Sequence, residues 1–480
     1  MLFPTITFAI FFLVVYVLNW ALMPRLRLWK WFIIAASYVF YGWWDWRLIF
    51  LLVGATLVNQ GLGVQVHRAL GGRRGSRAAA RRWLILAVAA NLVTLGVFKY
   101  FDFFVVNLND VLGAFGMDAP LPLLRIVLPV GISFLVFRML TYVIDIYRGQ
   151  LAPAPTLDFA VYTAFFPYLL AGPIARAGEF LPQLTSPRNP HAVDSSRAFV
   201  LILGGLIKKM LIADYLSTHI VGGLFASPQT YSSWETLWGI IAYAVQIYCD
   251  FSAYADIAIG ISLLLGFELP ANFDAPYTAR TIQDFWRRWH ITLSSWLRDY
   301  LYIPLGGNRK GRGRTYANLV ITFLLGGLWH GAGWTFVFWG LMHGTGLALE
   351  RARADARHSR GLRAPGATAG ARALQRLWVF AFVSVAWVFF RAESMGNALA
   401  VLWRPIAGLG SVGSAAAPAV VGLVALGIAS QYVPRRTIRG LEAGFSRVGW
   451  VGQGLMLARA LFLIDVLGPA GPAEFLYFKF

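Results

Sequence analysis

Long apolar stretches alternate with short polar or basic connections along most of the chain. The first stretch, 2–23, has no basic segment before it and no small-residue cleavage pattern before Pro24, which indicates an uncleaved transmembrane helix. A helix needs roughly 20 apolar residues to cross a bilayer. Further stretches of this character lie at 31–44, 47–66, 83–101, 124–146, 159–182, 196–222, 235–266, 316–333, 334–350, 377–391, 417–433 and 450–468. Several are short or interrupted by Gly and Pro, so the pattern predicts an all-α polytopic membrane protein with about eleven spans plus re-entrant and interfacial helices.

Basic residues are concentrated in five of the connections. These are 25–30, 68–82, 280–314, 351–376 and 435–447, whereas no Lys or Arg occurs in 106–122, 223–234 and 408–418. Because Lys and Arg are retained on the cytoplasmic side of a membrane, we expect the five basic connections to lie in the cytoplasm. The three connections without Lys or Arg, and the N-terminus, are expected on the opposite side. The connection 351–376 is rich in Ala, Gly and Arg and has no wide hydrophobic stripe, which predicts a mobile cytoplasmic loop.

The composition indicates that lipid surrounds a large part of the protein. Of the 480 residues, 58% are hydrophobic and 13% are charged, a balance that one water-soluble core does not accommodate. The aromatic share of 15% suits the two headgroup belts of a multi-span protein. A net charge of +20 would suggest nucleic acid in a soluble protein, but basic residues placed between apolar stretches indicate topology and contact with anionic lipid. Membrane lipid is therefore an expected partner, and nucleic acid is not.

Several kinds of chemistry are excluded by the motifs that the chain lacks. The single cysteine, Cys249, allows neither an intramolecular disulfide nor a thiolate metal cluster, and its apolar surroundings indicate a packed thiol. The sequence contains no HExxH, no GxSxG, no GxGxxG after a strand and no paired CxxC. We therefore expect no metal site, and neither a soluble-type hydrolase nor a dehydrogenase site.

Ionisable residues within apolar sequence cost roughly 2.5 to 3.5 kcal/mol on insertion scales and mark candidate sites. The first cluster of them is CDFSAYADIAIG, 249–260. A helical repeat of about 100° per residue places Asp250 and Tyr254 on one face, and Ser252 and Asp256 on another. Polar contacts between helices explain this pattern, each carboxylate being satisfied by a hydroxyl or an arginine. Alternatively, one of the two Asp residues is the partner of a catalytic imidazole.

The second cluster, 281–314, reads TIQDFWRRWHITLSSWLRDYLYIPLGGNRKGRGR and mixes Trp and Tyr rings with many cations. This pattern predicts an amphipathic helix at the cytoplasmic interface. Helical spacing places Trp286 and His290 on one face, and Asp284 can pair with an arginine three or four residues later.

A basic, glycine-rich turn ends this cluster. Positive-inside anchoring explains its cations, and the alternative is that they bind the phosphates of a donor such as coenzyme A. The run GGNRKGRG lacks the spacing of a P-loop. The cations in question are Arg309, Lys310, Arg312 and Arg314.

The third cluster is GGLWHGAGW, 326–334, in which His330 lies between two apolar helices where glycines permit a sharp bend. Imidazole is the side chain best matched to proton transfer near neutral pH. A solvated loop histidine needs no function, but apolar sequence encloses His330 on both sides, which favours a functional role. His343 lies one helix later and could share the same cavity, where a packing role is expected.

Taken together, these motifs resemble one known family, the alginate O-acetylase branch of the membrane-bound O-acyltransferases. The resemblance begins at LPVGISF (128–134), YVIDIYRG (142–149) and FFPYLLAGPIARAGEFLPQL (165–184). It continues through the three clusters above and ends in the aromatic tail FLYFKF (475–480), in family order over about two thirds of the chain. The first cluster departs from the commonest DFSGYSD form at Ala253 and Ala255, both of which replace one small residue by another.

The resemblance implies one membrane domain, 1–480, with core motifs in 128–350 and C-terminal helices in 377–480, in a bacterial inner membrane. It implies that His330 is the essential histidine of the family and His290 its second motif histidine. We expect four residues to support them, namely Asp250, Asp256, Tyr254 and Trp329.

The resemblance also implies the reaction. A tunnel lets a cytoplasmic thioester, expected to be acetyl-CoA, meet a periplasmic acceptor, with no cofactor bound by the enzyme. The hypothesis is that His330 acts as general base on the acceptor hydroxyl while a water-poor channel protects the thioester. The acceptor is either a glycan such as alginate or a serine on a periplasmic acetyltransferase or acetyl-carrying partner of a polysaccharide acetylation complex.

Three alternatives remain at this point. A D-alanyl or peptidoglycan O-acyltransferase shares the architecture. Gly-broken helices with buried Asp and His also describe proton-coupled transporters, although the polar motifs here crowd into 165–344 without a counterpart elsewhere. A noncatalytic scaffold of a polysaccharide synthase would tolerate replacement of His330.

Overall fold

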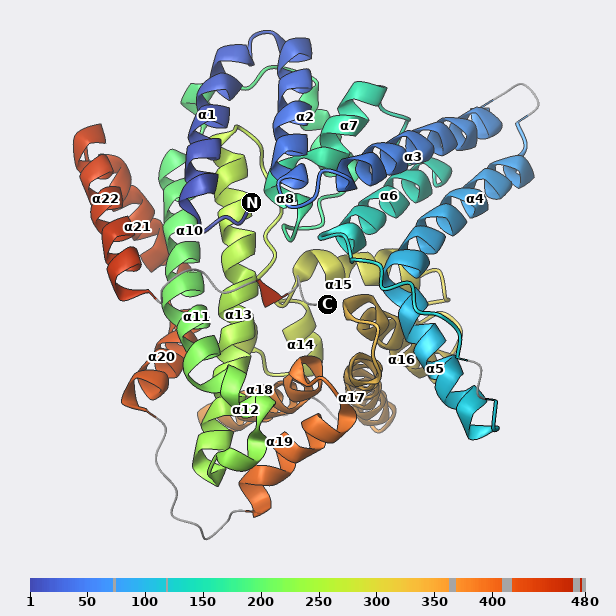
Figure 1. Ribbon diagram of the computed structural model, residues 1–480, viewed down its shortest axis with the longest axis vertical. Coiled ribbons are helices and arrows are strands. Elements are labelled where there is room, and N and C mark those ends of the chain that lie inside the picture. Colours follow the sequence, from blue (N-terminus) through green and yellow to red (C-terminus); the bar gives the residue numbers. More distant parts are fainter. Residues whose placement is uncertain (72–74, 118–119, 362–367, 408–416, 469–474, 477–480) are drawn as a thin grey trace. The chain divides into compact units, whose positions relative to one another are not determined.

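A computed structural model describes residues 1–71, 75–117, 120–361, 368–407, 417–468 and 475–476 (Figure 1). Regular structure within these ranges is helical only, which confirms the predicted all-α class. Four helices there are long and apolar enough to cross a membrane, and two shorter helices are also apolar. The long ones are Leu48–Gly71, Arg77–Ala114, Ser233–Leu264 and Ala369–Arg391, and the short ones are Ile6–Leu22 and Pro418–Tyr432. These helices agree with a membrane protein, whereas the predicted number of about eleven spans is not confirmed.

The chain forms two compact units. The first consists of residues 1–198 and 258–270, and the second of 199–257 and 271–480. Helix α13 (Ser233–Leu264) contributes to both, because its last turns fall in the first unit.

The first unit is built from apolar helices. Its helices are α1 (Ile6–Leu22), α2 (Leu26–Gly42), α3 (Leu48–Gly71), α4 (Arg77–Leu95), α5 (Phe101–Ala114), α6 (Ile132–Tyr147), α7 (Thr156–Ala164), α8 (Phe166–Leu169) and α9 (Ala177–Phe180). Figure 1 shows α3 and α4 side by side, with α6 beside them. Buried amides connect the first two, since Asn91 donates to the side-chain oxygen of Asn59 at 2.7 Å. Such hydrogen bonds hold helices together in lipid, where apolar contact alone gives little preference for protein over lipid.

The second unit carries the three candidate clusters, except for residues 258–260 at the end of the first cluster. Its helices are the greater part of α10 (Ser195–Leu206), then α11 (Asp214–Leu216), α12 (Gly222–Ala226), α13, α14 (Ile282–Trp286), α15 (Ile291–Leu297), α16 (Arg312–His330), α17 (Trp334–Ser359), α18 (Ala369–Arg391), α19 (Met395–Ala407), α20 (Pro418–Ala429), α21 (Arg435–Arg447) and α22 (Trp450–Leu467). Between α10 and α11 the chain winds as a π-helix, η4 (Ile207–Ala213), and Figure 1 shows this run lying along α13.

Glycines bring α16 and α17 into close contact. A Cβ atom on Gly327 would lie 2.2 Å from the carbonyl oxygen of Phe336, and one on Gly340 would lie 2.3 Å from the carbonyl oxygen of Phe323. Both distances are far below van der Waals contact, so only glycine permits this approach of the two backbones. The close packing fixes His330, the last residue of α16, directly before the bend that leads into α17, as the sequence predicted.

Two expected elements differ from the structure. The cluster 281–314 is not one amphipathic helix, because the chain breaks between α14 and α15 and continues into a π-helix, η8 (Arg298–Tyr302). The loop expected at 351–376 is helical at both ends: α17 extends to Ser359 and α18 begins at Ala369, while 362–367 lie outside the described residues. The physical reason is composition, because ALERARADAR consists almost entirely of strong helix formers.

Candidate active site

His330 lies in a cage of aromatic rings at the end of α16. Its side chain is buried, with 4% of the residue exposed. The ring centroid lies 4.9 Å from that of Trp329, 4.9 Å from that of Trp339 and 5.1 Å from that of Phe390, and each contact is edge-to-face. These rings exclude bulk water, so the imidazole of His330 lies in a low-dielectric environment.

His290 is held in a backbone conformation that side chains rarely adopt. Its φ of 42° and ψ of 56° lie in the left-handed region, at the residue directly before α15. Buried Asn272 holds this conformation, because its backbone oxygen accepts from the N–H of Ile291 at 2.9 Å. Its side-chain oxygen accepts from the N–H and the hydroxyl of Thr292 at 3.3 and 2.9 Å. Strain stored at a buried position in this way is typical of functional sites.

The same Asn272 oxygen defines which nitrogen of His290 carries the proton. Nδ1 of His290 lies 3.1 Å from it. An amide oxygen can only accept, so Nδ1 is the donor, and Nε2 is the nitrogen that carries the lone pair of the neutral ring. Burial lowers the pKa of His290 to about 3, so the ring is neutral at physiological pH. His290 therefore has a hydrogen-bond-accepting nitrogen, Nε2, whose direction is fixed by the contact of Nδ1 with Asn272.

Trp329 connects the two motif histidines. Its ring contacts that of His330 and also that of His290, with 6.3 Å between the latter pair of centroids. The ring of Phe251, on α13, contacts His290 from another side at 4.6 Å. The structure thus brings the predicted residues His290, Trp329 and His330 into one buried cluster of the second unit.

Asp250 lies in a charged cluster with lysine rather than beside an imidazole. Nζ of Lys209 is 2.8 Å from Oδ1 of Asp250 and 2.8 Å from Oδ1 of Asp214. The other oxygen of Asp250 accepts from the backbone N–H of Leu476 at 2.9 Å. Between the two alternatives weighed for this acid, these contacts favour polar connection of elements, with a lysine in place of the expected hydroxyl or arginine.

Asp256 has the neighbouring lysine as its partner. Nζ of Lys208 lies 2.5 Å from Oδ2 of Asp256 and donates to the hydroxyl of Ser252 at 2.9 Å. One lysine thus contacts the two residues that helical spacing assigned to a shared face.

Tyr254 occupies the other face of α13, where it is buried. The ring of Phe475 packs on it with 4.0 Å between centroids, and Phe475 also contacts Phe251. The first two residues of the aromatic tail therefore dock on the face that bears Asp250 and Tyr254.

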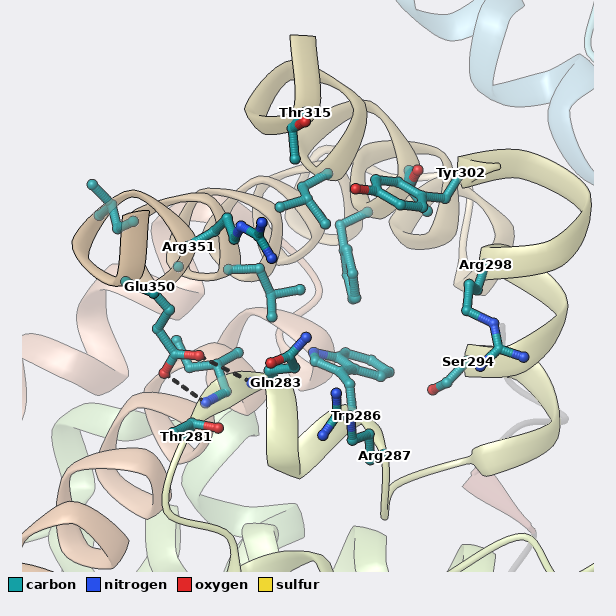
Figure 2. A pocket seen from close by; sticks show the side chains of 18 of the residues that line it. Thr281, Gln283, Trp286, Arg287, Ser294, Arg298, Tyr302, Thr315, Glu350 and Arg351 are labelled. Carbon is teal, nitrogen blue, oxygen red and sulfur yellow. Dashed lines mark hydrogen bonds between the residues drawn. The ribbon is translucent and has the colours of Figure 1, made fainter. Parts of the chain in front are cut away.

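A cavity of about 1020 Å³ opens in the same unit between α14, α15, α16 and α17 (Figure 2). Its floor is apolar, and its lining includes five arginines. They are Arg287, Arg298, Arg351, Arg353 and Arg357. Figure 2 shows the indole of Trp286 reaching into this cavity from α14. A cavity with an apolar interior and several guanidinium groups suits a ligand with an apolar or neutral end and an anionic end.

The four cations considered for donor phosphates are not part of the lining of this cavity. Asn308 lines it, while Arg309 and Lys310 follow in the next turn and Arg312 begins α16. Three of the arginines that do line it, at 351–357, come from the segment expected to be a loop. They lie on α17 instead, which is why sequence reasoning missed them.

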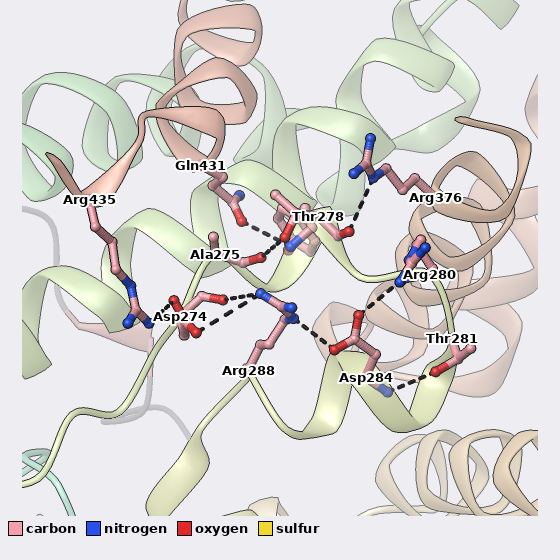
Figure 3. A network of polar contacts seen from close by, with 11 residues as sticks. Asp274, Ala275, Thr278, Arg280, Thr281, Asp284, Arg288, Arg376, Gln431 and Arg435 are labelled. Carbon is pink, nitrogen blue, oxygen red and sulfur yellow. Dashed lines mark hydrogen bonds and ion pairs between the residues drawn. The ribbon is translucent and has the colours of Figure 1, made fainter. Parts of the chain in front are cut away.

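An ion-pair network fixes the segment that leads to His290 (Figure 3). Arg288 lies between two acids, 2.8 Å from Asp284 and 3.9 Å from Asp274. This confirms the predicted pairing of Asp284 with an arginine one turn later. Asp274 also pairs with Arg435 at 2.8 Å. The network ties the turn before α15 to α14 and α21.

The chain is similar to proteins of one family. Residues 143–391 match the model of the membrane-bound O-acyltransferase family. A probable alginate O-acetylase of Azotobacter vinelandii is 44% identical over 388 residues, which cover 79% of this chain and 72% of the relative. One from Pseudomonas aeruginosa is 43% identical over 390 residues, covering 80% and 70%. The peptidoglycan O-acetyltransferase of Helicobacter pylori is 38% identical over 410 residues, covering 80% and 74%.

Proposed function

The chain belongs to the membrane-bound O-acyltransferase family and is a membrane O-acetyltransferase, and we propose that it serves the O-acetylation of an exopolysaccharide such as alginate in a bacterial inner membrane. In this proposal the acetyl group comes from a cytoplasmic thioester, acetyl-CoA, and leaves on the periplasmic side. The observation that carries the proposal is the shared position of His290 and His330 around Trp329, in the unit that also holds the arginine-lined cavity.

The cavity supports the choice of donor. Guanidinium groups bind phosphate oxygens through paired hydrogen bonds, and five of them line this cavity. The phosphates of coenzyme A would bind there, and the neighbouring Arg309, Lys310 and Arg312 would add to the positive field. The neutral acetyl end would lie towards the apolar floor, on the side of Trp286.

His330 would act as the general base. It would accept the proton of the acceptor hydroxyl while the hydroxyl oxygen forms a bond to the acetyl carbon. The carbon–sulfur bond then breaks, and the proton passes from the imidazolium to the leaving thiolate. His290 would accept a hydrogen bond at Nε2 and orient the hydroxyl, a role that its fixed and neutral ring suits. The aromatic cage would protect the thioester from water.

The acceptor side depends on partners outside this chain. We propose that the acetyl group passes either to the glycan itself or to a periplasmic acetyltransferase or acetyl-carrying subunit. The names of the alginate and peptidoglycan relatives support a polysaccharide of the cell envelope as the final acceptor.

Replacement of His330 by alanine tests the enzymatic proposal. Polymer acetylation is measured by NMR in cells that carry His330→Ala, with the amount of protein in the membrane checked by immunoblot. Acetylation should fall to background. The matched control is His358→Ala, since this histidine is exposed near the end of α17 and should be dispensable. Full acetylation in the His330→Ala strain would favour a scaffold role instead.

A further inference from the structure

A hydrogen bond between two buried rings fixes the orientation of Trp286. Its indole Nε1 donates to Nδ1 of His343 at 3.2 Å. His343 lies on α17 and is completely buried, and 6% of Trp286 is exposed. Because Nδ1 accepts this bond, the neutral imidazole carries its proton on Nε2. A buried tryptophan N–H needs such an acceptor, so rotating the indole away would leave both groups unsatisfied.

The indole held in this way lies between the cavity and the His330 cage. On one side Trp286 lines the cavity, together with Phe323, whose ring is 4.8 Å from it. On the other side its ring lies 5.7 Å from that of Trp339, and Trp339 contacts His330 at 4.9 Å. Trp286 is therefore the part of the cavity wall that leads towards the catalytic histidine.

We propose that Trp286 limits the acyl group of the donor to acetyl size, and that His343 is the positioning residue that holds the indole in place. This inference rests on the proposed use of the cavity by a thioester donor. It adds a determinant of acyl length to that function, carried by one hydrogen-bonded pair. A longer acyl chain would need the space that the indole fills.

The size of the effect follows from burial of apolar groups. Each methylene transferred from water into an apolar site favours binding about fourfold, which corresponds to about 0.8 kcal/mol. Removing the indole by Trp286→Ala opens room for several methylenes. A butyryl donor has two more methylenes than acetyl, so the ratio of kcat/KM for butyryl over acetyl should rise about 16-fold.

The experiment compares acetyl-, propionyl- and butyryl-CoA as donors for the purified enzyme with its acceptor. His343→Ala should raise the butyryl to acetyl ratio in the same direction by a smaller factor, because the indole remains but loses its fixed orientation. His343→Asn should restore acetyl preference, since the asparagine oxygen takes the place of Nδ1. Trp286→Phe keeps a ring but removes the N–H, and it should resemble His343→Ala. The control is Trp403→Ala, which removes an exposed tryptophan of α19 that does not line the cavity and should leave donor preference unchanged.

The outcomes separate this inference from the proposed function. If the wild-type enzyme uses acetyl-CoA and Trp286→Ala and His343→Ala lower kcat/KM for all three donors in proportion, the acyl-length role is refuted while the donor proposal stands. An equal shift in donor preference with Trp403→Ala would also refute it. If the wild-type enzyme transfers no acyl group from any of the three donors, the donor proposal itself fails, and this inference fails with it.

Discussion

Replacing Lys209 by methionine should destabilise the protein strongly, because this lysine neutralises two buried acids. Its side chain is 1% exposed, and the side chains of Asp214 and Asp250 are each 2% exposed. Removing one partner of a buried ion pair costs about 3 to 5 kcal/mol, since the remaining charge has no compensation. Lys209→Met leaves two such carboxylates close together. We therefore expect a loss of at least about 3 kcal/mol in the free energy of unfolding.

The neighbouring Lys208 provides a matched control. Its pair with Asp256 is more accessible, with side chains 18% and 28% exposed, and water can solvate the acid once the lysine is gone. Lys208→Met should therefore cost about 1 kcal/mol or less. Both variants change the same residue type on the same π-helical segment, so local helix effects cancel in the comparison.

Unfolding in mixed micelles, titrated with sodium dodecyl sulfate, measures the difference. A third variant tests the cause: Lys209→Met combined with Asp214→Asn and Asp250→Asn removes the buried charges and should recover most of the lost stability. Equal destabilisation by Lys208→Met and Lys209→Met, or no recovery in the triple variant, would refute the electrostatic reasoning.

Three further results are expected. Asn272→Ala should lower kcat about tenfold or more with little change in KM for the donor, because Nδ1 of His290 loses its acceptor. Asn272→Asp should retain part of the activity, and steady-state kinetics measures both variants. The free energy of unfolding should fall by up to about 1.4 kcal/mol per pH unit as the pH decreases from about 6.5 towards 3, because burial lowers the pKa of His290 to about 3 and in that range only the unfolded chain binds the proton. His290→Gln should remove this part of the pH dependence in the same micelle titration. Gly327→Ala should reduce both stability and activity, since its Cβ would lie 2.2 Å from a carbonyl oxygen of α17. Gly313→Ala, in the first turn of α16 with open space around it, should be neutral or should stabilise the protein by about 0.5 to 1 kcal/mol in thermal unfolding.

The sequence predicted the parts of the site that depend on local pattern. Helical spacing assigned Ser252 and Asp256 to one face of α13, and Lys208 contacts both. The glycines around His330 predicted the bend at the end of α16. The apolar surroundings of Cys249 predicted a packed thiol, and this cysteine is fully buried. Each of these features depends on residues only a few positions apart.

Contacts between distant residues were beyond such reasoning. The acids of α13 were expected to meet a hydroxyl, an arginine or an imidazole, yet their partners are two lysines some forty residues earlier in the chain. A signal for them existed, because two consecutive lysines within an apolar stretch must find acceptors when buried. Asn272 binds the turn that interrupts the helix expected at 281–314, and nothing in the sequence around it indicated this contact. Its effect on His290 comes from one side chain and one carbonyl that tertiary structure places against the turn.

The second unit separates its charges from its imidazoles, and this separation agrees with the division of roles proposed for them. Asp250 and Asp256 are balanced by lysines, which serves structure because a paired charge costs less in lipid than a single one. His290 and His330 are instead surrounded by rings. The charged cluster at Lys209 and the aromatic cluster at Trp329 would then have separate roles. Variants in the charged cluster should act mainly on stability, and variants in the aromatic cluster should act mainly on catalysis.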